Sequence, residues 1–430
     1  MSNEIMYDGN PEMRQPTSPA EETCRITSCL LTSALAASLG TSFLVGYNIS
    51  VMTGPSAFIQ TFYNLSYYDQ HGLYLSEGHS LWLWAFTIAI FCIGGSLGAL
   101  GSTYISDVYG RRGALLMTCA IAVLASVLMG ISQLINVYQL VIAGRFIIGV
   151  AGGIVLVTTP LYLSEISPVR FRGGVAAIHQ LGVSLGILVA QLLGLYPLYT
   201  QELWPILLAM TGVFSLIGCS VLVCCPESPR WYLIRSSTTQ HVGESEALLQ
   251  DNENRYRARE SLKRLRATGD VEVEIAEMLY ERRQELSASR VGILDVITLK
   301  DPMWKWPLII SIVLHSSQQL AGINAVMYYT TELFIQASLS KEVVKVATCG
   351  TGLVIVITDV ITIFFVDKLG RRFFLLLSYS VMAAATVFLT VSMTANGDVW
   401  PYLSIVSVYI FLFGFSPGPG AMTMVIVPEI

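Results

Sequence analysis

The chain has 430 residues, of which 53% are hydrophobic and only 13% are charged, with a formal net charge of −5 at pH 7. A soluble globular chain carries about 25% charged residues. The composition therefore excludes an ordinary soluble domain and indicates a membrane protein with many spans.

Ten stretches of the chain are apolar over the length of a membrane-spanning helix, which needs about 20 residues. Residues 1–27, which precede them, are polar and have no apolar segment followed by a cleavage site. We expect them to form a disordered cytoplasmic tail rather than a signal peptide. The expected spans lie near residues 28–52, 81–105, 114–134, 138–162, 173–194, 204–225, 306–334, 343–366, 373–394 and 401–427.

The distribution of Lys and Arg among the loops predicts the orientation of these spans. The segments 53–80, 135–137 and 195–203 contain neither residue, whereas the alternate loops and the stretch 227–305 contain several arginines. The positive-inside rule then places the N-terminus in the cytoplasm. The loop at 53–80 would lie outside, where Asn64 begins an accessible glycosylation sequon.

The two halves of the chain share motifs. The sequence DVYGRR at 107–112 recurs as DKLGRR at 367–372, and LSEI at 163–166 recurs as VPEI at 427–430. Two parallel halves joined by a charged segment are the plan of the major facilitator fold. The second half ends just after its copy of the motif, as a truncated product or splice form would, so we expect it to lack two spans. The expected units are a six-helix bundle over 28–226, cytoplasmic linker helices over 227–305 and an incomplete four-helix bundle over 306–430.

Several further motifs occur in order from about residue 28 to the end. They read PLYLSEISPVRFRG at 160–173, HQLG at 179–182, PESPRW at 226–231 and QQLAGIN at 318–324. Together with the two GRR turns, they resemble the facilitative hexose transporters of the sugar porter family. This resemblance implies an all-α membrane protein of the major facilitator fold. It also implies facilitative transport of fructose, glucose or both across the plasma membrane by alternating access.

Amide side chains within the apolar span at 306–334 require an explanation, because an unpartnered polar group in hydrocarbon is costly. Carboxamides donate and accept hydrogen bonds, as the hydroxyl groups of a sugar do. We expect Gly322 to let this helix unwind and turn the amides toward one cavity. The alternative is that the amides hold helices together. The resemblance implies sugar contacts for Gln180, Gln318, Gln319 and Asn324.

Several positions depart from the pattern of the family, among them Met424 and Ile355. Met424 replaces the tryptophan that is usual in its glucose carriers, which favours fructose, whereas Asn324-Ala-Val resembles the glucose type, so the hexose stays open. Ile355 replaces an asparagine of the eighth span, and Asp359 follows one turn later on the same face. An acid in the middle of a span is a functional candidate. We expect Asp359 to bind substrate or to gate, with a structural role or proton coupling as alternatives.

Residues near the ends of the spans are expected to act as gates. The resemblance implies an outer gate at Tyr328 and Tyr329, for which an interfacial aromatic belt is the alternative. Acidic residues serve no topological purpose beside Arg-rich loops, so we expect cytoplasmic salt bridges that lock the two halves in an outward-open state. The expected lock residues are Arg112, Arg145, Glu165, Arg172 and Glu227 in the first half and Arg371, Arg372 and Glu429 in the second.

Other classes of function find no support in the sequence. It shows no nucleophile–base pair and no metal-ligand spacing among its cysteines, and its glycine clusters lie within spans. We therefore expect neither an enzyme nor a nucleotide-binding protein, and no cofactor, metal, nucleic acid or obligate protein partner. The expected partners are a small sugar and the lipid bilayer. A non-transporting fragment and a proton-coupled sugar symporter remain alternatives to facilitative transport.

Overall fold

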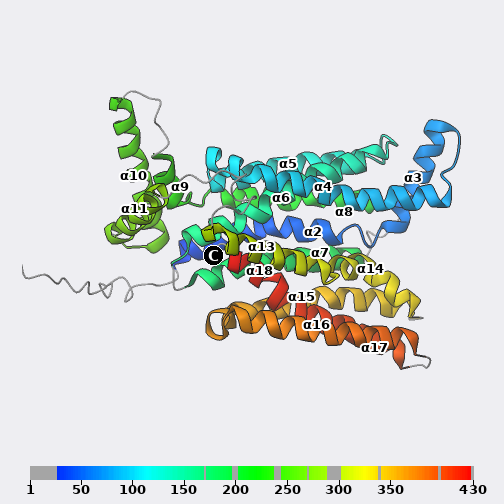
Figure 1. The fold of residues 1–430 in the computed structure, drawn as a ribbon. Helices are drawn as coiled ribbons and strands as arrows, with labels where there is room; N and C mark the ends of the chain where they lie inside the picture. Colours follow the sequence, from blue (N-terminus) through cyan, green and yellow to red (C-terminus); the bar gives the residue numbers. More distant parts are fainter. Residues whose placement is uncertain are drawn as a thin grey trace, which may run out of the picture.

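The structure is a computed structural model of the chain. It describes residues 27–168, 171–195, 202–236, 244–268, 271–287, 302–337, 340–395 and 399–427. Over these residues the regular structure is entirely helical, and Figure 1 shows long helices that lie side by side in a bundle.

Six long helical stretches form the first half of the bundle. Helix α6 packs against α4 and α5, and α8 packs against α5. Glycine permits this close approach, because a Cβ at Gly94 would lie 2.3 Å from the carbonyl oxygen of Phe146. The first stretch is α1 (Ser28–Ala37), continued by the π-helical turn η2 (Ser38–Ser42) and α2 (Phe43–Ser50). The other five are α4 (Glu77–Tyr109), α5 (Arg111–Ile131), α6 (Gln139–Ile166), α7 (Arg172–Leu195) and α8 (Trp204–Leu222). The shorter helix α3 (Ser56–His71) lies between the first stretch and α4 in the sequence.

Three helices that connect the two halves in the sequence lie beyond one end of the bundle (Figure 1). They are α9 (Pro229–Ser236), α10 (Glu244–Arg266) and α11 (Glu272–Ser287). Leu262 and Ile275 belong to a small apolar core of their own, which explains why these highly charged segments fold. We call this end of the bundle the linker end, and the opposite end, where α3 lies, the far end.

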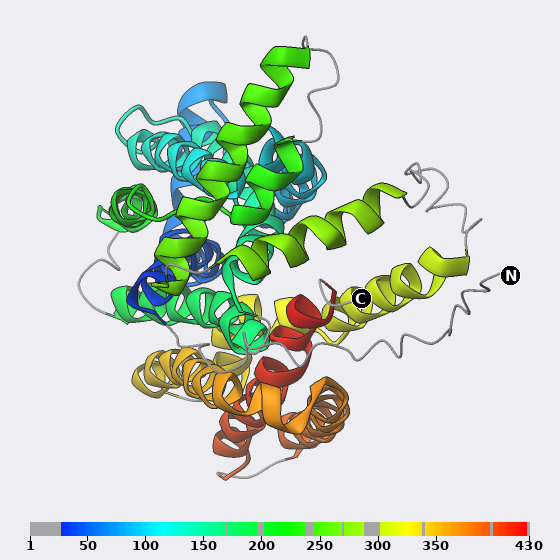
Figure 2. The same cartoon turned by 90° about the vertical axis from the view of Figure 1, so that its left-hand side faces the viewer.

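The second half lies against the first along α7. Helix α15 packs extensively against α7, and α16 packs against α17. Seen from the linker end in Figure 2, the second half forms a separate group of helices beside the first. Its elements are α13 (Pro302–Leu320), α14 (Ile323–Gln336), α15 (Lys341–Leu369), α16 (Arg371–Thr394), α17 (Trp400–Phe415), the π-helical turn η4 (Ser416–Gly420) and α18 (Met422–Ile426).

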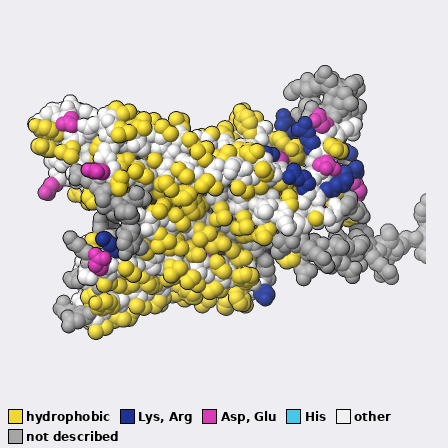
Figure 3. Space-filling view, turned by 180° about the vertical axis from the view of Figure 1, so that it is seen from behind, with side chains coloured by type: hydrophobic (Ala, Val, Ile, Leu, Met, Phe, Trp, Pro, Cys, Tyr) yellow, Lys and Arg dark blue, Asp and Glu magenta, His cyan; other side chains and the backbone are white. Residues whose placement is uncertain are grey.

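Within the described part of the chain, nine helical stretches are long and apolar enough to cross a membrane. Figure 3 shows the matching surface, a broad hydrophobic belt with most of the charged side chains gathered at its two ends. The tenth expected span, at 306–334, is divided into α13 and α14. Gly322 separates them with a φ of +86°, a left-handed conformation that glycine adopts without strain. The predicted unwinding at Gly322 is therefore confirmed.

Candidate functional site

Amide side chains from both halves approach the turn η4. Gln318 of α13 is 8% exposed, and its Nε2 donates a hydrogen bond to the carbonyl oxygen of Pro419 at 2.8 Å. Gln180 of α7 also lies near the turn, since a Cβ at Gly420 would be 3.5 Å from its Nε2. The π-helical turn therefore brings one amide from each half to the same short segment.

The other two predicted amides, Gln319 and Asn324, lie on either side of the helix break. Asn324 Nδ2 donates a hydrogen bond to Gln319 Oε1 at 2.7 Å, and both side chains are exposed. An uninterrupted helix would point residues five positions apart in different directions, about 140° from one another. The break at Gly322 thus pairs these two amides, and the four amides lie in two groups rather than one.

Asp359 of α15 is almost fully buried, with 2% of its surface exposed. Its two carboxylate oxygens accept hydrogen bonds from the hydroxyls of Ser184 in α7 and Ser416 in η4. Asp359 therefore connects α15 to the other half and to the turn that holds Gln318. Met424, the remaining predicted substrate contact, lies half-buried in α18.

A cavity of about 240 Å³ lies between the two halves toward the far end. Its lining includes Ser50 of α2, Gln191 of α7, Thr331 of α14 and Thr348 of α15. Gln191 also links the halves directly, because its Nε2 donates to the hydroxyl of Thr351 at 3.0 Å and its Oε1 accepts from a backbone N–H of α15 at 3.1 Å. The cavity combines hydroxyl and amide groups with apolar walls, as binding sites for small polar molecules do.

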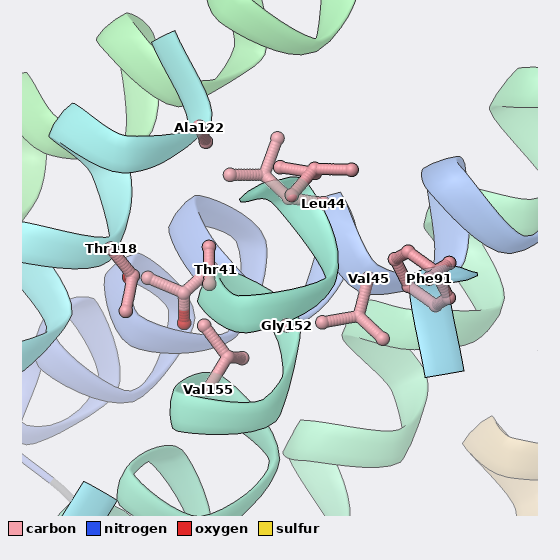
Figure 4. Close-up of a pocket in the computed structure, with 10 residues that line it drawn as sticks. Thr41, Leu44, Val45, Phe91, Thr118, Ala122, Gly152 and Val155 are labelled. Atoms are coloured by element: carbon pink, nitrogen blue, oxygen red, sulfur yellow. The ribbon is translucent and has the colours of Figure 1, made fainter. Parts of the chain in front are cut away.

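A second pocket lies inside the first half, among α2, α4, α5 and α6 (Figure 4). Thr41 and Thr118 face it, but Leu44, Val45 and other apolar side chains form most of its wall. Its volume of about 10 Å³ is at the limit for a single water molecule. This pocket is a packing defect and is too small for a sugar.

A buried ion pair lies at the linker end of the first half. Arg111 Nη2 and Glu165 Oε1 are 3.0 Å apart, with side chains 6% and 8% exposed. The hydroxyl of Ser228 donates to Glu165, and Asp107 accepts from Arg111 at 3.0 Å. Sequence reasoning missed Arg111, although the repeated GRR turn contained the signal, because the following arginine was taken as the partner of the acids.

Arg112 and Glu227 make different contacts from those of a salt bridge. Glu227 accepts hydrogen bonds from the backbone N–H groups of Arg112 and Gly113, where a carboxylate favours the N-terminus of α5. The Arg112 guanidinium donates to the carbonyl oxygens of Leu222 and Val223 at the end of α8. Each charged group therefore lies at a helix end whose dipole has the opposite sign.

The predicted composition of the lock was wrong for Arg145. This residue lies 20 positions before Glu165 on the same helix, which separates them by about 30 Å. Arg145 is fully buried toward the far end, where its Nη1 donates to the carbonyl oxygen of Asn48 at 2.9 Å and its guanidinium covers the Phe91 ring at 4.5 Å.

The contacts of Glu165 and Glu227 also lie within the first half and the start of the linker, not between the halves as predicted. Each acid faces the α4–α5 turn of its own bundle. Arg172 begins α7, and Arg371 begins α16 with its Nη1 donating to the carbonyl oxygen of Val366 at 3.3 Å. Arg372 is exposed, and Glu429 lies outside the described residues.

The predicted outer gate and the sequon lie toward the far end. Tyr328 of α14 is in electrostatic contact with the Arg145 guanidinium, so this contact crosses between the halves. The side chain of Tyr329 lies outside the described residues. Asn64 lies half-buried on α3, and its Oδ1 accepts a hydrogen bond from the backbone N–H of Leu75 at 2.8 Å.

Burial at the linker end has a consequence for pH dependence. It raises the pKa of the Glu227 carboxyl above its ordinary value of 4.5, despite the backbone N–H groups that it accepts from. The Glu227 carboxyl therefore stays protonated to a higher pH in the folded protein than in the unfolded chain. The contribution of Glu227 to stability is therefore present below pH 4.5 and is lost as the pH rises through the raised pKa.

We expect Glu227→Gln to remove this part of the pH dependence, since glutamine does not titrate. The measurement is the melting temperature in detergent, followed from acidic to neutral pH. Glu281→Gln, which changes an exposed carboxylate, is the control and should keep the pH profile of the original protein. An identical profile for Glu227→Gln would contradict the prediction.

The two helical bundles, with Gln180 of one half and Gln318 of the other beside the same turn, define a class of protein. This class is a two-bundle membrane transporter with a polar site between its halves. Residues 33–430 match the model of the family described as "Sugar (and other) transporter". The chain belongs to this family.

Named relatives and solved structures agree with this membership. Facilitated glucose transporter member 5 of sheep is 35% identical over 97% of this chain and 80% of the relative, and member 1 of chicken is 36% identical over 95% and 80%. The proton:xylose symporter XylE, solved with 6-bromo-6-deoxy-D-glucose, shares the fold with a TM-score of 0.78 at 21% identity, over 94% of this chain and 82% of that one.

Proposed function

We propose that this protein carries a hexose, fructose or glucose, down its gradient by alternating access of its two halves. The observation that supports this most directly is the convergence of Gln180 and Gln318 on η4. Amides that offer both donors and acceptors suit a neutral sugar and would bind a charged substrate poorly. The relatives named as facilitated glucose transporters support the same assignment.

The proposal assigns directions to the two ends. The Arg-rich linker end faces the cytoplasm, as the positive-inside rule requires, and the far end faces outside. A hexose would enter the cavity beside Gln191 and move about 16 Å along α7 to Gln180. Gln319, Asn324 and Met424 would complete its contacts, and Tyr328 would close the entrance. Asn64 at the far end is the proposed glycosylation site, and the plasma membrane is the proposed location.

A proton-coupled symporter is the second candidate. Asp359 supports it as a carboxylate that connects the two halves within the membrane-spanning region. The fold neighbour XylE is named as a proton:xylose symporter. Uptake that requires an inward proton gradient would favour this candidate over a uniporter.

The decisive experiment is uptake of labelled D-fructose and D-glucose into proteoliposomes that contain the purified chain. We expect saturable uptake of at least one hexose, independent of a proton gradient, and its loss in Gln319→Ala. Gln139→Ala, which changes an exposed glutamine at the far end, is the control. Absence of binding and uptake for both sugars in folded protein would contradict the proposal and favour a non-transporting form.

A further inference from the structure

Asp359 connects the two structural elements that hold the central amides. All three members of its cluster are deeply buried, with Ser184 and Ser416 0% exposed and Asp359 2%. Each serine hydroxyl donates to a different oxygen of the carboxylate. Both oxygens of Asp359 therefore contact protein groups in this conformation, and almost no surface of the side chain is left for a sugar. This arrangement argues against the direct substrate contact that the sequence led us to expect.

The contact on the side of η4 leads to Gln318. Ser416 is the first residue of the π-helical turn, and Pro419 within the same turn accepts the hydrogen bond of Gln318. A π-helical turn that contains two prolines has few internal hydrogen bonds to fix its position. The Asp359–Ser416 hydrogen bond supplies such a fixed point from α15.

The contact on the side of α7 leads to Gln180. Ser184 lies one turn after Gln180, and its hydroxyl also reaches the Gln180 carbonyl oxygen at 3.1 Å. Asp359 therefore contacts α7 within one turn of the amide that the first half contributes. One carboxylate connects the segment that bears Gln180 to the segment that holds Gln318.

We propose that Asp359 is a positioning residue for the sugar site, which holds η4 and α7 in register so that Gln180 and Gln318 can bind one ligand together. This inference rests on the proposed function, because the ligand is taken to be a hexose. The physical reason is that affinity depends on preorganised partners, and a loosened turn would have to be ordered again by each sugar that binds. Asp359 acts through Ser184 and Ser416 and does not touch the sugar.

The test compares the equilibrium binding of labelled hexose to purified protein and its variants. Asp359→Ala removes both hydrogen bonds, and we expect it to raise the Kd about tenfold or more. Thr362→Ala is the matched control, because Thr362 is 1% exposed on the same helix and, among the described residues, its hydroxyl donates to the carbonyl oxygen of Thr358 on that helix. We expect the control to keep a Kd within about twofold of the original.

Two further variants separate positioning from a general structural role. If Asp359 acts through Ser416, then Asp359→Ala should raise the Kd by a smaller factor in the Ser416→Ala variant than in the original protein. The double variant Asp359→Ser with Ser416→Asp exchanges the two side chains and keeps one carboxylate and one hydroxyl at the α15–η4 contact. It should therefore bind the hexose more tightly than Asp359→Ser alone or Ser416→Asp alone. This exchange also serves if Asp359→Ala fails to fold.

The outcomes are distinct. An unchanged Kd in folded Asp359→Ala, with only the yield of folded protein reduced, would overturn the proposal and leave a purely structural role. Fully additive effects of Asp359 and Ser416 would overturn it as well. Failure of the proposed function is recognised separately, since the original protein would then bind no hexose and Gln318→Ala would change nothing.

Discussion

Gln318→Ala is expected to weaken hexose binding by about ten- to a hundredfold, one of the two largest effects that the structure predicts. The change removes an amide that is 8% exposed, and it leaves the carbonyl oxygen of Pro419 in η4 without this donor. A site built to meet hydroxyl groups loses most when one of its polar partners is removed, because the ligand then buries an unpaired group.

Equilibrium binding of labelled hexose, with a melting curve for each variant, is the measurement for Gln318→Ala. Gln70→Ala is the control, because Gln70 is an exposed amide on α3 at the far end. A Kd equal to that of the original protein would show that Gln318 only joins α13 to η4, as an interhelical hydrogen bond would.

Glu165→Ala is expected to lower the free energy of unfolding by about 3–5 kcal/mol. The change leaves the guanidinium of Arg111, which is 6% exposed, without its buried partner. Asp107 still contacts Arg111, but it is 56% exposed and screened by water, so it replaces little of the lost interaction. The cost is the penalty for an uncompensated buried charge rather than the net value of the pair.

The measurement for Glu165→Ala is denaturant unfolding of the purified protein in micelles. Glu281→Ala is the control, because its partner Arg230 and its own side chain are 30% and 54% exposed, and we expect a change of about 0–1 kcal/mol. The double change Arg111→Met with Glu165→Met should recover much of the loss, since no charge is then left unpaired. Equal effects of Glu165→Ala and Glu281→Ala would contradict the prediction.

The arrangement of helices was largely predictable, because hydrocarbon imposes long apolar segments and pairs backbone groups within each helix. Nine expected spans are helices of suitable length, and charged helices occur within 227–305. The break at Gly322 was also predictable, since glycine adopts the left-handed conformation of the break without strain, but the shared cavity expected from it was wrong, because the amides lie in two groups. The motifs likewise indicated Gln180 and Gln318, which the structure places beside η4.

Contacts between helices were not predictable in the same way. Ser184 and Ser416 lie 175 and 57 residues from Asp359, and only the rotation of each helix about its axis decides that they meet. Sequence spacing contains little of that information when a helix is apolar on every side. Arg145 shows the converse error, because motif membership suggested a contact that the rise of a helix excludes.

The helix break at Gly322 has a consequence for molecules that would block this protein. A Cβ at Gly322 would meet no atom within 4 Å, so there is open space on that side of the junction between α13 and α14. Met327, Thr331 and Ile335 recur every four positions on the face of α14 that lines the cavity toward the far end. If α14 turns about this break, these three side chains move together, so we expect a ligand in the cavity and the closure of α14 to affect one another. We therefore expect a compound larger than the cavity to lodge beneath α14 and to inhibit without occupying the proposed sugar site at η4.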